Sequence, residues 1–328
     1  MVISPSQFYS EYMRASATMG IPPGALDFQT RFLPPPEQQD MPIVLVANSH
    51  KETRPYAKPN SRAETTINCF LDAELKRISR GDGIEMFAGQ FSPYRVLPNR
   101  YPFGPTHILL THDGHSRKPA SVPTLEELTT LDRFSAEASC PVWRNVLGTN
   151  ASAPYHDHAH AMKDYVVFPV SQMQIISDGR GVGHLIDFPG QHAVFYGKHR
   201  AKGAYRLMQR LQGVAHPSEE MREYGLFPFA TLFAADRIFV APVRTPQISQ
   251  PHRIGAGELF GYHAAPIREI IERTVGYTKW NRLGRDSRRA AVAETLGQIT
   301  YDNVRSRIAQ VLFPTNDPNF NLYRLLRR

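Results

Sequence analysis

Hydrophobic residues in this chain recur in short runs, which is the pattern of buried β-strands. The runs predict strands over residues 42–47, 84–97, 142–147, 229–233 and 237–242. The last two are close enough to pair as a hairpin. A β-sheet is therefore expected to form a large part of the fold.

Segments with helical character lie between some of these runs. Helices are expected over residues 63–78, 203–211 and 286–312, and from Thr124 to a position before Pro141. Thr124 and Glu127 have the spacing of a capping box, in which each side chain bonds a backbone N–H at the helix start. The apolar side of the 286–312 segment is typical of a core or interface helix.

Residues 1–41 are rich in proline and glutamine and include three consecutive prolines at Pro34–Pro36. Such a composition favours turns and irregular backbone over helices and strands. We expect an irregular N-terminal arm with little chemistry of its own.

The composition indicates a soluble globular protein. The chain has 328 residues, 41% hydrophobic and 21% charged, which is enough to bury a full core in one large domain or in two fused halves. No basic segment followed by an apolar run begins the sequence, and no stretch of about 18 apolar residues occurs. We therefore expect a cytoplasmic protein with no membrane partner.

The cysteine content indicates the redox compartment, and the net charge indicates the class of binding partner. Two cysteines, Cys69 and Cys140, cannot build a disulfide framework, which favours a reducing compartment. The formal net charge of +8 suits a polyanion. The basic residues are scattered except near residues 285–289 and at the C-terminus, and the sequence has no helix-turn-helix or aromatic RNA-binding signature. A phosphate-rich small molecule, rather than nucleic acid, is the expected partner.

Three histidines at alternate positions form the group that organises the chain: His156, His158 and His160. Side chains alternate along a strand, so all three imidazoles would lie on one face. A metal site or a polar strand face would explain such a row. The Gly148–Pro154 loop before it favours a nucleophile, because free backbone N–H groups in such a loop can hold an anion beside a neutral imidazole.

His-x-His-x-His after a loop of this kind resembles the histidine-triad superfamily. In that superfamily the middle histidine attacks an α-phosphate and forms a covalent nucleotidyl-histidine, so the resemblance makes His158 the nucleophile and His156 and His160 its catalytic neighbours. Galactose-1-phosphate uridylyltransferases and diadenosine tetraphosphate phosphorylases carry glutamine at the last position, whereas small hydrolytic members carry histidine. This chain carries His160.

A basic segment follows the 42–47 strand and contains Lys51 and Arg54. A solvated turn would explain it. The segment is also similar to the part of the uridylyltransferases in which two basic residues hold the nucleotide phosphates, the first being arginine there and Lys51 here. Arg54 can bind phosphate oxygens through two N–H groups, whereas Lys51 would act as a point charge.

Three more residues would bind substrate by the same resemblance. Asn99 opens an Asn-x-x-Pro passage that continues to His107, and it would lie near the sugar or base unless it only closes a turn. His107 alternates with apolar residues and is expected to be structural. Asn145 has a spacing to the triad that phosphorylases share. Ser152 lies one residue from the position of the phosphate-binding serine of the family.

The resemblance also implies a structural zinc site formed by Cys69, Asp72, His115 and His156. The family has a second cysteine where this chain has Asp72. Thiolate, imidazole and carboxylate are all accepted zinc ligands. Cys69 as a small buried hydrophobe and Asp72 as a helix cap remain the alternative.

The second half of the chain resembles a weak copy of the first without a second triad. We therefore expect an α+β fold of two fused histidine-triad-like halves, each a mostly antiparallel sheet with helices packed on one face. The expected division is an arm over 1–41, a catalytic half over 42–175 and a second half with C-terminal helices over 176–328. A homodimer is a further expectation.

The resemblance implies a nucleotidyltransferase that acts on an NDP-sugar or a nucleoside polyphosphate through His158. His160 in place of glutamine keeps open a nucleotide hydrolase with the same intermediate. A catalytically silent protein that binds nucleotide is the third possibility.

Overall fold

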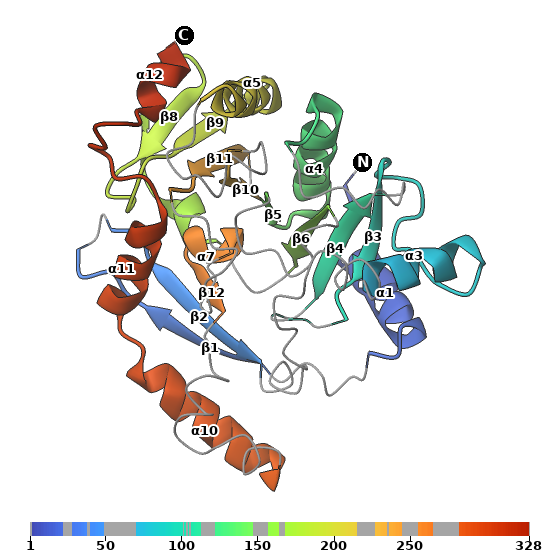
Figure 1. Ribbon diagram of the computed structural model, residues 1–328. Coiled ribbons are helices and arrows are strands. Elements are labelled where there is room, and N and C mark those ends of the chain that lie inside the picture. The colour runs from blue at the N-terminus through green and yellow to red at the C-terminus, as the bar shows by residue number, and fades with distance from the viewer. Residues whose placement is uncertain are drawn as a thin grey trace.

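The computed structural model describes residues 2–21, 28–37, 40–48, 70–100, 102, 104, 106–112, 122–146, 157–163, 168–214, 227–234, 236–244, 255–264 and 282–327. Its centre is a nine-stranded sheet (Figure 1). In spatial order the strands are β3 (Tyr94–Pro98), β4 (His107–His112), β6 (His158–Met162), β5 (Val142–Asn145), β10 (Phe229–Ala234), β11 (Arg237–Pro242), β9 (Ala193–Tyr196), β8 (Val182–Leu185) and β7 (Ile175–Ser177). All neighbouring pairs in this sheet are antiparallel.

The strand order shows the expected duplication. The first half runs β3, β4, helix α4 (Leu125–Ala138), β5, β6, and the second runs β8, β9, helix α5 (Arg200–Gln212), β10, β11. In the sheet the strand orders of the two halves mirror each other on either side of the β5–β10 pair. In that pair Ala230 lies opposite Asn145 and Phe233 lies opposite Val142. The expected α+β fold of two fused halves is thus confirmed, and the halves share one continuous sheet.

Helices α4 and α5 cover one face of this sheet side by side (Figure 1). Their buried residues, including Leu131, Phe134, Leu207 and Met208, pack against strand residues of both halves. The capping box at the start of α4 forms as expected: Thr124 Oγ1 accepts from the Glu127 N–H, and Glu127 Oε2 accepts from the Thr124 N–H. Helices on one face of the sheet therefore match the expectation.

The opposite face is covered by a second layer. It contains a three-stranded sheet of β1 (Phe28–Leu33), β2 (Ile43–Asn48) and β12 (Tyr262–Ala264), and the helices α7 (Ala256–Leu259), α10 (Arg285–Gln298) and α11 (Tyr301–Val311). Apolar residues of this layer form a core with the central sheet, for example Leu45, Leu259 and Ile308 with Trp143 and Phe239. The central sheet is therefore buried on both faces.

The expectation of an irregular arm over 1–41 is wrong for much of that segment. Helix α1 (Pro5–Thr18) begins at the cap Ser4 with proline in its first turn, where a missing N–H costs nothing. Phe8, Tyr12 and Ala15 are buried at helical spacing, and β1 pairs with β2. The prolines 34–36 only end β1, since proline interrupts strand pairing.

Two further boundaries differ from the expectation. The segment 286–312 is two helices, because Ile299 and Thr300 are extended (ψ of 123° and 157°) and Thr300 caps α11 through the Asn303 N–H. The strand expected over 84–97 begins only at Tyr94, after a series of turns. The remaining elements are α3 (Phe70–Ser79), a 3-10 turn η3 (Pro169–Gln172) and α12 (Leu322–Arg327). Among the described residues no helix has the length and apolar character needed to cross a bilayer.

Candidate functional site

Strand β6, which carries His158 and His160, lies in the first half of the sheet, between β4 and β5. His158 is its first residue and pairs with Thr111 of β4, and His160 pairs with Leu109 of β4 and Trp143 of β5. Alternation along the strand places His158 and His160 on the face of the second layer, while Ala159 and Ala161 pack in the α4 core. The expectation that alternate histidines share a strand face is confirmed for His158 and His160.

The two histidines form a compact aromatic group with Trp143. The rings of His158 and His160 meet edge to face with centroids 4.8 Å apart. The His160 ring stacks on the Trp143 indole at a centroid distance of 5.4 Å and an interplanar angle of 13°. His158 and His160 are 4% and 7% exposed. Stacking and burial hold the His160 ring in one plane beside His158.

A chain of hydrogen bonds continues from His160 away from His158. The Nδ1 atom of His160 lies 3.1 Å from Nε2 of His107, and Nδ1 of His107 lies 3.1 Å from the amide nitrogen of Asn99, which is also 3.3 Å from Nε2. In the tautomer in which the Asn99 amide donates to His107 Nδ1, His107 carries its proton on Nε2 and donates it to His160 Nδ1, and a neutral His160 then carries its own proton on Nε2. In the opposite tautomers Nε2 of His160 carries no proton and can accept a hydrogen bond.

This arrangement gives two residues contacts that the sequence did not predict, and it leaves the expected substrate role of Asn99 a prediction. His107, expected to be structural, is fully buried and bonds a site histidine. Asn99, expected near the sugar or base, is 6% exposed and bonds His107. Trp143 was not identified from the sequence. The sequence places Trp143 in the same predicted strand as Asn145, which could have drawn attention to it. Its contact with His160 depends on the pairing of β5 with β6.

Asn145, an expected substrate residue, lies at the end of β5 and bonds helix α7. Its Oδ1 atom accepts from the Ala256 N–H at 2.7 Å. Ala256 is the first residue of α7, whose N–H has no partner within the helix, so Asn145 supplies the missing acceptor. A Cβ on Gly257 would lie 3.3 Å from the Trp143 indole, which means that glycine permits this close approach. Helix α7 thus rests against the site through Asn145 and Trp143.

Glu258 lies in the first turn of α7 and caps the N-terminus of that helix. Its Oε2 accepts from the Gly255 N–H at 2.6 Å. This bond satisfies one of the donors at the helix start.

Several expected site residues lie outside the described residues: Lys51, Arg54, Ser152, His156, Cys69 and His115. Of the expected zinc ligands only Asp72 is described, in the first turn of α3, where its side chain is half-buried. The described part of the chain holds no group of three or more histidine, cysteine, aspartate or glutamate residues that fits a metal ion. The donor types of the four expected ligands suit zinc, and the site stays a prediction.

The second half has no counterpart of the histidine row. Strand β11, which occupies the position of β6 in the mirrored order, has the sequence Arg-Ile-Phe-Val-Ala-Pro. His192, which directly precedes β9, is buried. Its Nε2 accepts from the Leu185 N–H at 2.6 Å, and its Nδ1 lies 2.9 Å from the Gly190 carbonyl oxygen. Burial lowers the pKa of His192 to about 4. His192 is therefore a neutral residue whose two ring nitrogens are both hydrogen-bonded within the fold.

No family model matches the chain, and no curated protein matches it. Among solved structures, the chain is similar to the yeast Ap4A phosphorylase Apa2, with a TM-score of 0.57, 14% identity and coverage of 96% of each chain. The AMP complex of the yeast protein gives 0.55 and 14% over 94% of this chain and 96% of that one. Its Ap4A complex gives 0.54 and 13% over 96% and 99%. At this identity the likeness establishes the fold, and the resemblance to the uridylyltransferase and phosphorylase branch is confirmed at that level.

Proposed function

We propose that this protein is a nucleotidyltransferase in which His158 forms a covalent nucleotidyl intermediate. The observation that carries the proposal is the position of His158 at the start of β6, beside a His160 whose ring is fixed by Trp143 and His107. A nucleophile next to a fixed N–H donor is the arrangement that phosphoryl transfer needs.

The fold supports a nucleotide as substrate. The yeast Ap4A phosphorylase, whose fold this chain shares over nearly its whole length, has been crystallised with AMP and with Ap4A. The net charge of +8 is also suited to a polyphosphate ligand. We therefore propose a nucleoside polyphosphate or an NDP-sugar as the donor.

The reaction has two displacements. A ring nitrogen of His158 attacks the α-phosphorus, a P–N bond forms, and the P–O bond to the leaving phosphate or sugar phosphate breaks. An acceptor oxygen then attacks the same phosphorus and releases the imidazole. The Nε2–H of His160 would donate to a phosphoryl oxygen while negative charge builds up there. Lys51, Arg54 and the N–H groups of the loop before β6 would stabilise the remaining charge, as the family resemblance implies.

A hydrolase is the second candidate, because position 160 is an imidazole where the transferases carry glutamine. In the opposite tautomer, with the His160 proton on Nδ1 and donated to His107 Nε2, the unprotonated Nε2 of His160 can take a proton from an attacking water, which an amide cannot do. Hydrolysis and transfer share the first step and differ in the acceptor.

The test is to incubate the protein with Ap4A, with nucleoside triphosphates and with NDP-sugars, and to measure its intact mass. We expect an acid-labile increase equal to one nucleoside monophosphate, lost in His158→Ala. The matched control is His199→Ala, which removes an exposed histidine at the start of α5. Nucleotide binding without any adduct or turnover would instead identify a silent binding protein. An adduct that persists in His158→Ala would exclude His158 as the nucleophile.

A further inference from the structure

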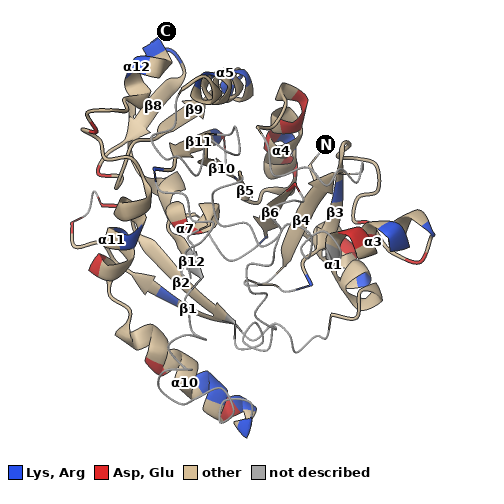
Figure 2. Cartoon of the chain, in the orientation of Figure 1, with Lys and Arg blue, Asp and Glu red and all other residues tan. Residues whose placement is uncertain are grey.

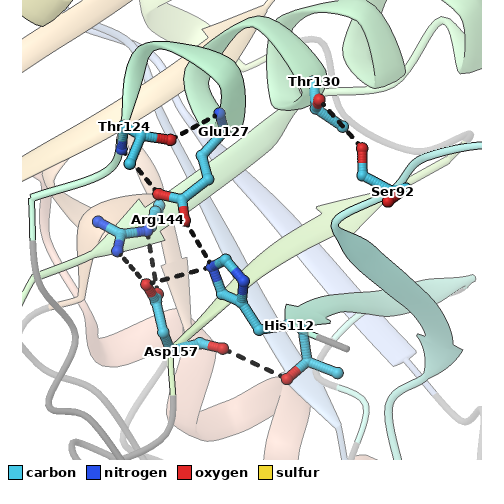
Figure 3. A network of polar contacts seen from close by, with 8 residues as sticks. Ser92, His112, Thr124, Glu127, Thr130, Arg144 and Asp157 are labelled. Atoms are coloured by element: carbon cyan, nitrogen blue, oxygen red, sulfur yellow. Dashed lines mark hydrogen bonds and ion pairs between the residues drawn. The ribbon is translucent and has the colours of Figure 1, made fainter. Parts of the chain in front are cut away.

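A group of four charged or titratable residues, two of them buried and two half-buried, lies behind His158, on the face of the sheet that α4 covers. It consists of Arg144 on β5, Asp157 just before β6, His112 at the end of β4 and Glu127 in the first turn of α4 (Figure 3). We call it the Asp157 cluster. The side chains of Arg144 and Asp157 are 0% and 8% exposed.

Asp157 is at the centre of this cluster. Its Oδ1 accepts from Arg144 Nε at 3.1 Å, and its Oδ2 accepts from Arg144 Nη2, so the guanidinium holds both carboxylate oxygens. His112 Nε2 lies 3.8 Å from Asp157 Oδ2 and 3.1 Å from Glu127 Oε1. The same Glu127 caps α4. The cluster therefore joins three strands and a helix at one point.

The backbone of Asp157 is held as well. Its carbonyl oxygen accepts from the Thr111 hydroxyl of β4 at 3.3 Å. Residue 157 is thus fixed by β5 through its side chain and by β4 through its carbonyl, on the two sides where β6 has its neighbours. The next residue is His158, the first of its strand. Strand ends open more easily than strand centres. The contacts of Asp157 therefore stabilise the end of β6 at which His158 lies.

The cost of this cluster argues for a role besides packing. Burying a carboxylate and a guanidinium loses much hydration energy, and an apolar pair of similar size is often as stable or more so. The neighbouring positions on this face, Val142, Ala159 and Ala161, are apolar and fully buried. An apolar residue at 157 would thus fit the core, but it would not be tied to β5 by two hydrogen bonds.

The charges of the cluster balance when His112 is protonated. The pKa of His112 is raised, chiefly by its hydrogen bond with Glu127, while burial acts in the opposite direction. For Glu127, burial raises the pKa, but the hydrogen bonds with His112 and the Thr124 N–H outweigh it, so the pKa is lowered. Two cations then face two anions, which keeps all four side chains in place.

We propose that Arg144 and Asp157 are positioning residues for His158: the Asp157 cluster fixes the start of β6 and so sets the orientation of the nucleophile. This inference rests on the proposed function for its catalytic consequence. Its structural content, that the cluster orders the backbone of residues 157–162, can be tested without any substrate.

The decisive variant is Arg144→Met/Asp157→Val. Removing one partner would leave a buried unpaired charge and could unfold the protein, whereas replacing both with apolar residues preserves the core. The matched control is Arg200→Met/Asp132→Val. It removes an ion pair between α5 and α4 on the same side of the sheet, with Arg200 Nε and Asp132 Oδ1 2.9 Å apart, and it touches no residue of β6.

Two measurements are needed, the rate of adduct formation at saturating nucleotide and the hydrogen exchange of the backbone over residues 157–162. We expect the Arg144→Met/Asp157→Val variant to keep its melting temperature and nucleotide Kd. Its adduct formation should fall by about 10- to 100-fold, the effect of a displacement of roughly 1 Å at a reacting group. Exchange should rise at 157–162 and stay unchanged in β10. The control should match wild type in both measurements.

A folded double variant with the full rate and unchanged exchange would overturn the proposal. A wild type that forms no adduct with any donor would remove the proposed function. In that case the exchange data alone decide whether the cluster orders β6: increased exchange in the double variant supports the anchor, and unchanged exchange contradicts it.

Discussion

The Nε2 atom of His107 and the Nδ1 atom of His160 lie 3.1 Å apart, although 53 residues separate them in the chain. Through this contact the tautomer of His107, whose ring the Asn99 amide also contacts, is coupled to the tautomer of His160. When His107 donates to His160, the Nε2–H of His160 supplies the same N–H donor as the glutamine of the transferases. The first two predictions test this relationship.

His107→Phe should slow adduct formation about tenfold. Phenylalanine can keep the stacking of residue 107 on Trp143, whose ring centroid lies 5.8 Å away, but it cannot donate to His160. A buried hydrogen bond is worth about 1.4 kcal/mol, or tenfold in rate.

Asn99→Asp is the complementary variant. A carboxylate accepts a hydrogen bond from His107 Nδ1, so the proton of His107 moves to Nδ1 and His160 becomes the donor to His107 Nε2. The 15N chemical shifts of the His160 ring should then exchange their protonated and unprotonated positions; unaltered shifts would contradict the coupling of the two tautomers.

His160→Gln should shift the ratio of transfer to hydrolysis toward phosphate acceptors and flatten the pH dependence near neutrality. An amide donates a hydrogen bond at every pH and cannot exchange a proton with water, whereas an imidazole with an ordinary pKa of about 6.5 can do both. Both products should be measured from one nucleotide donor between about pH 5.5 and 8.5, a range around that pKa. An unaltered product ratio and profile would assign His160 to packing alone.

Asn145→Ala should lower the free energy of unfolding by about 1–2 kcal/mol, because the Ala256 N–H would lose its acceptor at the start of α7. Asn145→Asp retains an acceptor and should keep most of that stability. Urea unfolding of the two variants measures the difference. If Asn145 also binds nucleotide, as the family resemblance implies, both variants will weaken nucleotide binding; equal affinities to wild type would limit Asn145 to holding α7.

His112 should make the stability of the protein depend on pH in one direction. Its folded pKa is raised, so its contribution is fully present below the unfolded pKa of about 6.5 and is lost as pH rises through the folded value. His112→Phe keeps a ring beside Tyr94 but has no charge, and it should be less stable than wild type by up to about 1 kcal/mol in mild acid. The gap between the two melting temperatures should narrow as pH rises from 6 to 9; a constant gap would show that His112 titrates as in the unfolded chain.

Metal analysis of protein purified without added metal should find about one zinc per chain, bound by Cys69, Asp72, His115 and His156. Cys69→Ala should lose the zinc together with thermal stability, because metal binding contributes to folding. Cys140→Ala is the control: that thiol is buried, its pKa is raised to about 12 by burial, and its removal should leave the metal in place. A metal-free wild type of full stability would leave Cys69 and Asp72 as structural residues.

Figure 2 shows lysine and arginine on α5, α10, α11 and α12, at separate places on the described part of the chain. The expectation that a small phosphate-rich substrate, rather than a nucleic acid, accounts for the charge stays a prediction.

Local sequence was enough to predict the elements whose cause is local. The alternation of His158 and His160 places both on one strand face, and Thr124 with Glu127 fixes the start of α4, because both effects act between residues that are near in the chain. Runs of buried apolar residues predicted β2, β5, β10 and β11 for the same reason. The mirrored second half was visible as a weak copy, since each half repeats the same order of strands and helix.

Only the tertiary structure decided which distant residues complete the site. His107 reaches His160 because β4 pairs with β6, and Asn145 reaches Ala256, 111 residues away, because α7 packs against the end of β5. Asp157 was not singled out from the sequence, and its bond to Arg144 depends on β5 being the other neighbour of β6. Strand order and register follow from the packing of the whole core and not from spacing along the chain, which is why the sequence by itself predicted the strand face shared by His158 and His160 but not the residues that contact them.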